Sequence, residues 1–189
     1  MLWHHPGSAR DYLRPQLAGM RHDDVSAGTG AERLHAWQEG RTGFPFVDAG
    51  MRQLHAEAWV HNRVRMVVAS FLVKDLHVEW QHGARYFMQM LRDGDLASNQ
   101  HGWQWVAGTG TDAAPYFRVF NPVTQGEKFD PDGEYVRRYV PELAHLPGKA
   151  AHTPWDAADG YAHGYPRRVV DHAAERLEAL ARLGEVSGG

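Results

Sequence analysis

The sequence of 189 residues contains no cysteine, which excludes disulfide bonds, cysteine-based zinc sites and a thiol nucleophile. It also lacks a long apolar run. The most hydrophobic stretch, residues 64–73, is interrupted by Arg65 and is far shorter than the roughly 20 residues that span a bilayer. The first residues, MLWHHPGSAR, lack the basic segment and the apolar stretch of a signal peptide. These absences predict a cytoplasmic protein with no membrane association.

An excess of positive charge is absent as well. Lys and Arg number 20 against 23 Asp and Glu, so the formal net charge is −3 at pH 7. Nucleic-acid-binding domains usually carry a basic footprint. Any DNA contact of this chain is therefore expected to come from a local patch, within a single domain that is long enough to bury a core.

The hydrophobic pattern predicts helices and shows no sustained alternation typical of strands. Val64, Val67, Val68, Phe71 and Leu72 follow the spacing of one apolar helix face. The expected fold class is all-α. Further helices are expected over residues 31–39, 47–58 and 84–92 and from Pro166 to about Leu183, with loops over residues 22–30 and 145–165.

A second face of the helix around Val64 carries residues that a core does not require. Asn62, Arg65, Met66 and Ala69 occupy this face, which indicates contact with a ligand or a partner.

The segment DGDLASNQHGWQW shows a similar mixture of polar and aromatic residues. Asp95, Asn99 and Trp103 recur every four residues and share one face of a predicted helix, while Trp105 points elsewhere. The shared face can offer polar groups and an aromatic ring to an aromatic ligand.

Two short motifs suggest other chemistries. Gly108, Gly110 and Ala113 match the dinucleotide-binding pattern G-x-G-x-x-A, but the preceding WQWV favours a helix over the strand that this motif needs. No nucleophile elbow is present. The Glu-x-x-His spacing of dimetal bundles occurs at Glu32/His35, Glu79/His82 and Glu142/His145, the last between two prolines. A dimetal, dinucleotide or hydrolase site is not favoured, and no metal ligands are expected.

The chain contains five long motifs: AWQEGRTGFPFVDAGMRQL, WVHNRVRMVVASFLVKDL, DGDLASN, GWQWVAGTGTDAAPYFR and FNPVTQGEKFD. They resemble the flavin-binding helical domain of DNA photolyases and cryptochromes, specifically the bacterial cyclobutane pyrimidine dimer photolyases. The resemblance is strongest over residues 34–155. It implies that residues 1–189 are the C-terminal part of an all-α FAD-binding bundle, without the N-terminal α/β antenna domain. The implied activity is that of a carbon-carbon lyase: light-dependent repair of pyrimidine dimers in DNA by electron transfer from reduced FAD.

The resemblance assigns FAD-contacting positions to Asn62, Arg65, Asp93, Asp95 and Asn99. Amides and carboxylates match the donors and acceptors of a flavin edge, and Arg65 can form an ion pair with Asp93. The alternative is that these residues only cap helices and form surface salt bridges. Asn99 falls beside the flavin N5, where the plant cryptochromes usually carry Asp, and this favours repair over signalling.

The resemblance also assigns aromatic and apolar positions. Trp80 and Trp103 fall on two members of the tryptophan chain that photoreduces the flavin. The outermost member has no counterpart upstream of Trp37. Trp105 and Met66 fall on positions that line the pocket for the flipped dimer, where aromatic and apolar surfaces replace lost base stacking.

Three basic residues, Arg63, Arg118 and Lys128, fall on phosphate-facing positions. Phosphate contacts anchor a duplex without reading its sequence. Tyr116, Phe117 and Phe120 are expected to complete this docking rim. The alternative is that the charges are ordinary solvated surface groups.

The chain departs from the family pattern at its start, where a Trp-Arg-Glu-Phe motif and the Ser/Thr-rich phosphate loop are not found. It is therefore expected to be truncated, to bind FAD weakly or incompletely and to be inactive by itself. Three alternatives stay open: a non-catalytic helical DNA-binding remnant, a fragment of a split photolyase whose N-terminal portion is encoded upstream, and a cryptochrome-like photoreceptor fragment. The implied partner in repair is DNA containing pyrimidine dimers.

Overall fold

The computed structural model describes residues 3–110 and 117–187, and within these ranges every regular element is a helix. The predicted all-α fold class is therefore confirmed. The elements are η1 (Pro6–Ala9), η2 (Pro15–Gly19), α1 (Gly28–Gln38), α2 (Pro45–Glu57), α3 (Asn62–Lys74), α4 (Trp80–Met90), α5 (Leu96–Ala107), α6 (Pro122–Phe129), α7 (Glu134–Tyr139), η3 (Pro141–Leu143), η4 (Gly148–His152), η5 (Pro154–Asp156) and α8 (His172–Ser187).

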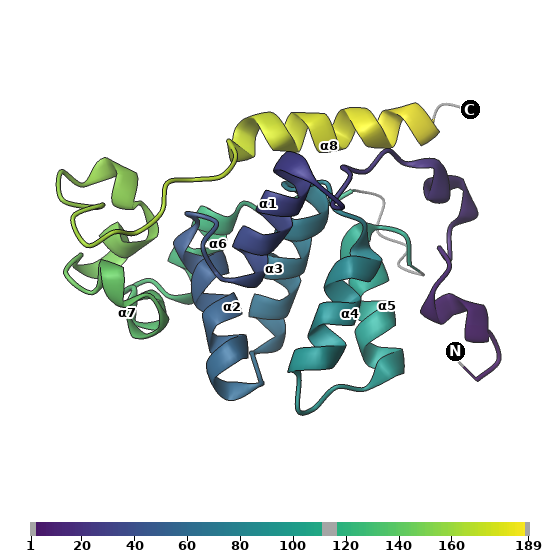
Figure 1. Ribbon diagram of the computed structural model, residues 1–189, viewed down its shortest axis with the longest axis horizontal. Coiled ribbons are helices and arrows are strands. Elements are labelled where there is room, and N and C mark those ends of the chain that lie inside the picture. The colour runs from purple at the N-terminus through teal and green to yellow at the C-terminus, as the bar shows by residue number, and fades with distance from the viewer. Residues whose placement is uncertain (1–2, 111–116, 188–189) are drawn as a thin grey trace.

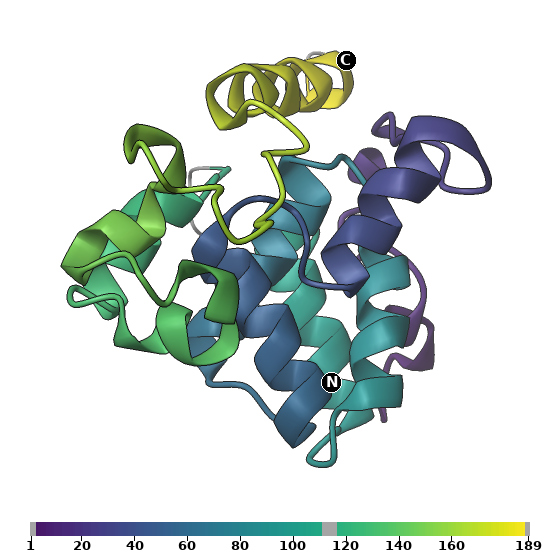
Figure 2. The ribbon, with the colours of Figure 1, turned by 60° about the vertical axis from the view of Figure 1, so that its left-hand side comes forward.

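Helix α3 is the element around which the others are arranged. It packs against α2 on one side and against α4 and α5 on the other. Figure 1 shows α8 crossing one end of this bundle, with α6 and α7 grouped beside α2. The turned view in Figure 2 shows α8 again outside the bundle, across the same end. One end of the bundle is thus covered, and the sides of α3 face different neighbours.

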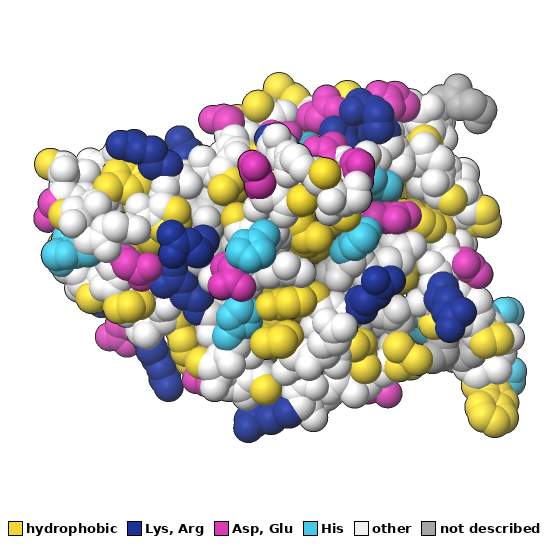
Figure 3. Space-filling view, in the orientation of Figure 1, with side chains coloured by type: hydrophobic (Ala, Val, Ile, Leu, Met, Phe, Trp, Pro, Cys, Tyr) yellow, Lys and Arg dark blue, Asp and Glu magenta, His cyan; other side chains and the backbone are white. Residues whose placement is uncertain are grey.

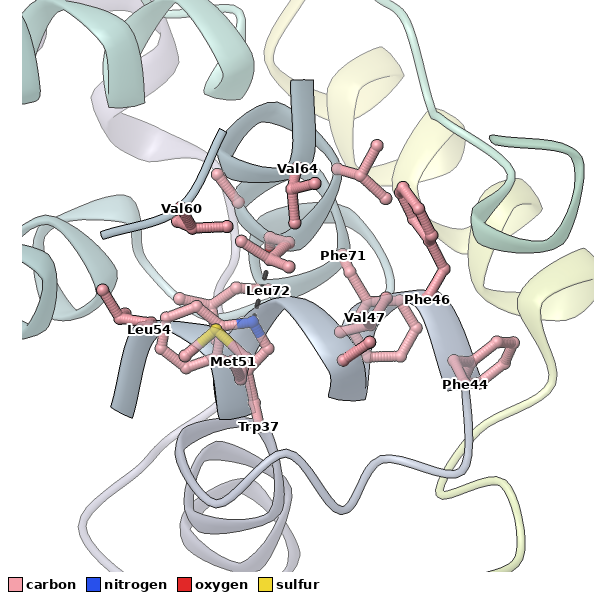
Figure 4. Packing of buried hydrophobic residues seen from close by; sticks show 14 of the residues in the cluster. Trp37, Phe44, Phe46, Val47, Met51, Leu54, Val60, Val64, Phe71 and Leu72 are labelled. Atoms are coloured by element: carbon pink, nitrogen blue, oxygen red, sulfur yellow. Dashed lines mark hydrogen bonds between the residues drawn. The ribbon is translucent and has the colours of Figure 1, made fainter. Parts of the chain in front are cut away.

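The apolar face predicted for α3 forms the middle of the core. Val67, Val68, Phe71 and Leu72 are all at most 1% exposed. Trp37 from α1 is fully buried among them, and its indole Nε1 donates a hydrogen bond to the carbonyl oxygen of Val68 at 2.9 Å. Figure 4 shows this bond within the packed side chains of α2 and α3. Because the buried indole N–H has a partner, Trp37 can be buried without leaving an unsatisfied donor in the core.

Helices α4 and α5 approach each other closely because α4 has a glycine where they cross. A Cβ atom on Gly83 would lie 2.1 Å from Cη2 of Trp103 and 2.6 Å from a methyl group of Leu72. The Trp103 side chain is 3% exposed and packs edge to face against Phe87, with ring centroids 5.1 Å apart. Gly83 therefore sets how deeply the Trp103 indole sits.

Charged groups attach α8 to the bundle. Arg182, only 7% exposed, forms an ion pair with Asp23 at 2.8 Å. The His172 ring is hydrogen-bonded to Asp75, a fully buried carboxyl group whose pKa is raised to about 6 by that burial. Figure 3 shows acidic and basic side chains interspersed along the upper edge of this face, where α8 lies.

Three predicted boundaries are wrong. The helix expected from Pro166 begins at His172, because Asp171 caps it by accepting a hydrogen bond from the Ala174 backbone N–H at 3.0 Å. The helix expected over residues 84–92 already begins at Trp80. The predicted loop over residues 22–30 likewise ends early, since α1 begins at Gly28.

The prediction of an extended surface connection over residues 145–165 is also wrong. This segment contains η4 and η5, and His152 and Tyr165 within it are buried. The His152 ring lies 2.6 Å from the carbonyl oxygen of Asp130. Helices α6 and α7 were not predicted. Helix α6 depends on a local cap, in which Asn121 accepts hydrogen bonds from the next two backbone N–H groups.

Gly83→Ala is expected to destabilise the chain by about 1–3 kcal/mol, because the added methyl group overlaps the Trp103 ring in a packed core. The matched control is Gly184→Ala on α8, where a Cβ meets nothing within 4 Å. It is expected to stabilise the chain by about 0.4–1 kcal/mol through the unfolded state and helix propensity. Urea unfolding measures both free energies. Equal effects of the two substitutions would contradict the tight α4–α5 crossing.

Candidate functional site

A pocket of about 160 Å³ opens between α3, α5 and the segment that joins α4 to α5. Its lining divides into two kinds of side chain. The apolar floor consists of Met66, Ala69, Phe87, Leu91, Trp103 and Val106. The polar rim consists of Asn62, Arg65, Asp93, Asp95, Ser98 and Asn99, with Gly94 and Gly102 between them.

The polar rim contains all the residues predicted to contact FAD. Asn62 and Arg65 come from the first turns of α3, Asp93 and Asp95 from the loop before α5, and Asn99 from α5 itself. Helix spacing explains the α3 part, since residues three and four apart share a face. The structure thus brings the five side chains together, whereas their role toward a cofactor stays a prediction.

Arg65 is held on both sides. Its Nε donates to the carbonyl oxygen of Val60 at 2.7 Å, and an Nη donates to the two carboxylate oxygens of Asp93 at 2.9 and 3.1 Å. The Asp93 side chain is 45% exposed, and ion pairs of this kind contribute only about 0–1 kcal/mol. The pair therefore matters more for orienting two charged groups at the pocket than for holding the fold.

Asp95 has a structural role in addition to its position in the rim. It is the N-cap of α5, where its carboxylate accepts a hydrogen bond from the Ser98 backbone N–H at 2.8 Å. Hydrogen bonds from the Ser98 side chain and then from this N–H hold the pKa of Asp95 below its usual value. The helix-capping alternative is thus correct for Asp95, and it coexists with a place in the pocket lining.

Asn99 is oriented by its amide nitrogen. Nδ2 donates to the carbonyl oxygen of Ala84 and to Oε1 of Gln100, both at 2.9 Å. These two bonds assign the nitrogen and the oxygen of the amide. Both N–H donors of the Asn99 amide are used in these bonds, and its Oδ1 can still accept a hydrogen bond at the pocket.

The two tryptophans predicted for electron transfer occupy different surroundings. Trp103 lines the pocket, and its ring contacts Phe87 and Trp37. Trp80 is 1% exposed, lies outside the pocket lining and packs edge to face against Tyr12, with centroids 6.4 Å apart. Only Trp103 is therefore in a position to touch a molecule in this pocket.

The residues predicted to contact the lesion are also separated. Met66 belongs to the pocket floor, whereas Trp105 is half-buried against the core and is not part of the lining.

Two of the basic residues meet at one aromatic ring. The guanidinium of Arg63 on α3 lies 4.7 Å from the ring centroid of Phe129, and the ammonium of Lys128 lies 5.5 Å from it. Phe129 is 44% exposed, so this cluster is at the surface. Cation–π contacts keep the two charges close together there.

The remaining residues predicted for the docking rim do not join this cluster. Arg118 is exposed, and its carbonyl oxygen accepts a hydrogen bond from the buried Lys74 ammonium. That ammonium also lies 4.1 Å from the Phe117 ring centroid. Phe120 is half-buried, with its backbone N–H directed to Ser70 Oγ at 3.4 Å. Tyr116 lies outside the described residues.

Several pocket residues were not predicted from the sequence: Phe87, Leu91, Gly94, Ser98, Gly102 and Val106. A sequence signal exists for some of them. Phe87 and Leu91 are four residues apart at the end of α4, and Gly102 follows Asn99 by three residues on α5. Extending the Asn99 face along α5 would have included Gly102, whereas the position of Phe87 and Leu91 at the pocket depends on how α4 packs against α5.

Two of the Glu-x-x-His motifs have other partners. Glu79 accepts a hydrogen bond from the Tyr12 hydroxyl at 3.0 Å, and Glu142 pairs with Arg52 at 2.7 Å. Gly108 is the C-cap of α5 with a φ of 82°, so a helix precedes the glycine pattern, and Ala113 lies outside the described residues. In residues 3–110 and 117–187, no cluster of three or more His, Cys, Asp or Glu side chains has metal-binding geometry. No helix within the same ranges has the length and apolarity to cross a bilayer.

The pocket fits one class of ligand. Its floor is aromatic and apolar, as a flat ring system requires, and its rim offers amide, guanidinium and carboxylate groups that match a ring edge with both donors and acceptors. An all-helical domain with such a pocket defines the protein as a candidate binder of a flat, heteroaromatic cofactor.

Comparison with known proteins gives the family. The chain belongs to the family described as the FAD binding domain of DNA photolyase, which it matches over residues 1–185. It is 52% identical over 183 residues to the deoxyribodipyrimidine photo-lyase of Escherichia coli (strain K12), an alignment that covers 96% of this chain and 38% of that protein.

Solved structures agree with this assignment. A bacterial class III photolyase from Agrobacterium tumefaciens superposes with a TM-score of 0.91 at 45% identity, covering 100% of this chain and 40% of that one. The archaeal photolyase from Sulfolobus tokodaii, solved with two FAD molecules, gives a TM-score of 0.88 at 36% identity, covering 97% and 41%. The chain therefore spans well under half the length of these relatives.

Asp95→Ala is expected to lower the urea midpoint at neutral pH, because α5 loses its N-cap, while Asp95→Asn retains a capping oxygen and most of the stability. The lowered pKa of Asp95 gives the sign of the pH dependence. The stabilising contribution is present above the pKa of the unfolded chain and is lost as the pH falls through the folded pKa. The deficit of Asp95→Ala should therefore disappear in acid. A deficit that is independent of pH would contradict the cap.

Proposed function

We propose that this chain supplies one wall of the FAD site of a DNA photolyase and that it acts, together with further protein surface, in light-dependent repair of pyrimidine dimers in DNA. The observation that carries the proposal is the pocket itself. Five residues assigned to FAD by resemblance come from α3, from α5 and from the loop that joins α4 to α5, and all of them line one pocket with an aromatic floor. Unrelated surface caps and salt bridges have no reason to converge in this way.

Each part of the lining has a function toward the cofactor. The floor of Trp103, Phe87 and Met66 excludes water from one face of a ring. Asn62 and Asn99 supply amides that bind its polar edge, and Arg65 is oriented by Asp93 to donate hydrogen bonds. Bound FAD would supply the light-driven electron chemistry, and these residues would orient it.

The size of the pocket indicates that this chain encloses only part of a FAD molecule. Its volume of about 160 Å³ is below the roughly 300–1,000 Å³ of sites that enclose a ligand of drug size. Several rim residues, such as Asn62 and Asp93, are exposed. Since affinity depends on enclosure and on prior ordering of the site, FAD is expected to bind this chain weakly. We accordingly assign residues 1–189 to part of a FAD-binding domain.

The cluster of Arg63, Lys128 and Phe129 supports DNA as the partner. It concentrates positive charge and an exposed ring on a chain whose net charge is −3. Cations beside an aromatic surface suit phosphates next to an unstacked base. The same cluster supports a second candidate function, DNA binding without catalysis. Light-dependent loss of dimers from a damaged oligonucleotide, measured with the assembled full-length protein, distinguishes the two.

Asp93→Ala is expected to weaken FAD binding about tenfold, which corresponds to about 1.4 kcal/mol, because Arg65 loses the group that orients it. Asp132→Ala is the matched control, since Asp132 is an exposed acid outside the pocket lining. Titration with FAD, followed by quenching of tryptophan fluorescence, measures both affinities.

The control should bind FAD as tightly as the parent chain. Equal losses in the two variants would overturn the assignment of the pocket. Stoichiometric FAD retained through purification of the parent chain would contradict the expectation that this chain binds FAD weakly.

A further inference from the structure

Helix α5 holds the N-terminal segment, residues 8–14, on a side that does not line the pocket. Gln104 on this side is fully buried, and its Nε2 donates to the carbonyl oxygens of Ser8 at 2.8 Å and Asp11 at 3.1 Å. Its Oε1 accepts a hydrogen bond from the Leu13 backbone N–H at 3.0 Å. The segment is therefore attached to α5 through its backbone.

Gln100 connects this segment to the pocket. Its Nε2 donates to the carbonyl oxygen of Ala9 at 2.6 Å, and its Oε1 accepts a hydrogen bond from Nδ2 of Asn99 at 2.9 Å. The same Nδ2 donates to the carbonyl oxygen of Ala84 on α4, also at 2.9 Å. These four groups form one hydrogen-bonded chain from the N-terminal segment, through the rim of the pocket, to α4.

We propose that Gln100 is a positioning residue of the pocket, which joins the N-terminal segment to Asn99 and fixes the Asn99 amide with its oxygen available to a ligand. Gln100 is not part of the pocket lining, so it acts through Asn99. The inference rests on the proposed function in one respect only, that the ligand is FAD.

The direction of each hydrogen bond is fixed by the carbonyl groups at the two ends of the chain. A carbonyl oxygen only accepts, so Gln100 has to present its nitrogen to Ala9, and its oxygen is left for Asn99. The Ala84 carbonyl likewise requires the nitrogen of Asn99. Both ends thus give the same orientation of the Asn99 amide, which leaves Oδ1 as the group that can accept a hydrogen bond from a ligand.

The contribution of Gln100 is to satisfy the second N–H of Asn99. Without it, the bond to Ala84 alone leaves one N–H of Asn99 without a protein partner, and a ligand has to select one orientation of the amide on binding. The loss of one neutral hydrogen bond corresponds to about a fivefold loss of affinity. An amide that is oriented in advance avoids this loss.

The first test requires no FAD. NMR spectra of the isotope-labelled chain show the two side-chain amide protons of Asn99 separately. Met has a similar length to Gln and only a weakly accepting sulfur. In Gln100→Met, the proton bonded to Gln100 should move toward the shift of a solvent-exposed amide, whereas the proton bonded to Ala84 should keep its shift. Unchanged shifts of both protons would overturn the proposal.

The second test is a double-mutant cycle with FAD titration. Gln100→Met is expected to weaken FAD binding about fivefold, and it should have no further effect in Asn99→Ala, because no amide is left to orient. Additive losses would overturn the role of Gln100. An unchanged affinity in Asn99→Ala would contradict the proposed function instead, and the amide shifts would still decide whether Gln100 orients Asn99.

The matched control separates Gln100 from the segment that it contacts. Gln104→Met loosens residues 8–14 from the same helix and leaves the bond between Gln100 and Asn99 in place. It should weaken FAD binding less than Gln100→Met, and equal losses would overturn the proposal. Since Gln104 is fully buried, urea unfolding checks its folding. If it does not fold, Ser8→Ala is the control, because Ser8 Oγ lies 3.1 Å from the His101 ring on α5.

Discussion

The contact between Trp103 and Gly83 is the constraint on which the site depends. With no side chain at Gly83, α4 approaches α5 closely enough for the indole to sit between them, 3% exposed, against Phe87 and Trp37. From that position one edge of Trp103 reaches the pocket, and the remainder joins the core. A ring held by packing on several sides keeps one orientation, which a binding surface needs.

The polar rim is built from groups that also have local structural tasks. Asp95 caps α5, and Asp93 pairs with Arg65 at the surface. The cap stabilises α5, whereas the exposed ion pair contributes only about 0–1 kcal/mol, and neither contribution requires that these groups gather at one pocket. The chain belongs to the FAD binding domain family of DNA photolyases, and the proposed role of the pocket in binding that cofactor gives the gathering a reason.

Helical periodicity in the sequence was enough to predict much of the pocket lining. The two faces of α3 and the alignment of Asn99 with Trp103 follow from helical spacing. Contacts between distant segments did not follow from it: Trp37 meets Trp103 because α1 packs on α2 and places its indole against α3. Pro166 was a misleading start signal because the cap at Asp171 decides where α8 begins. Long motifs identified the family and its candidate residues, whereas only the fold separated Trp103, in the pocket, from Trp80 outside it.

The proposed function requires that the pocket between α3 and α5 is the flavin surface of this chain. The most direct measurement is NMR chemical-shift mapping of the isotope-labelled chain during addition of FAD. We expect the indole N–H of Trp103 and the side-chain amides of Asn62 and Asn99 to shift with one common saturation curve. The buried indole of Trp37 should shift less, and the Asn121 cap of α6 should not shift. Shifts concentrated around α6 or α8, with Trp103 and Asn99 unchanged, would contradict it.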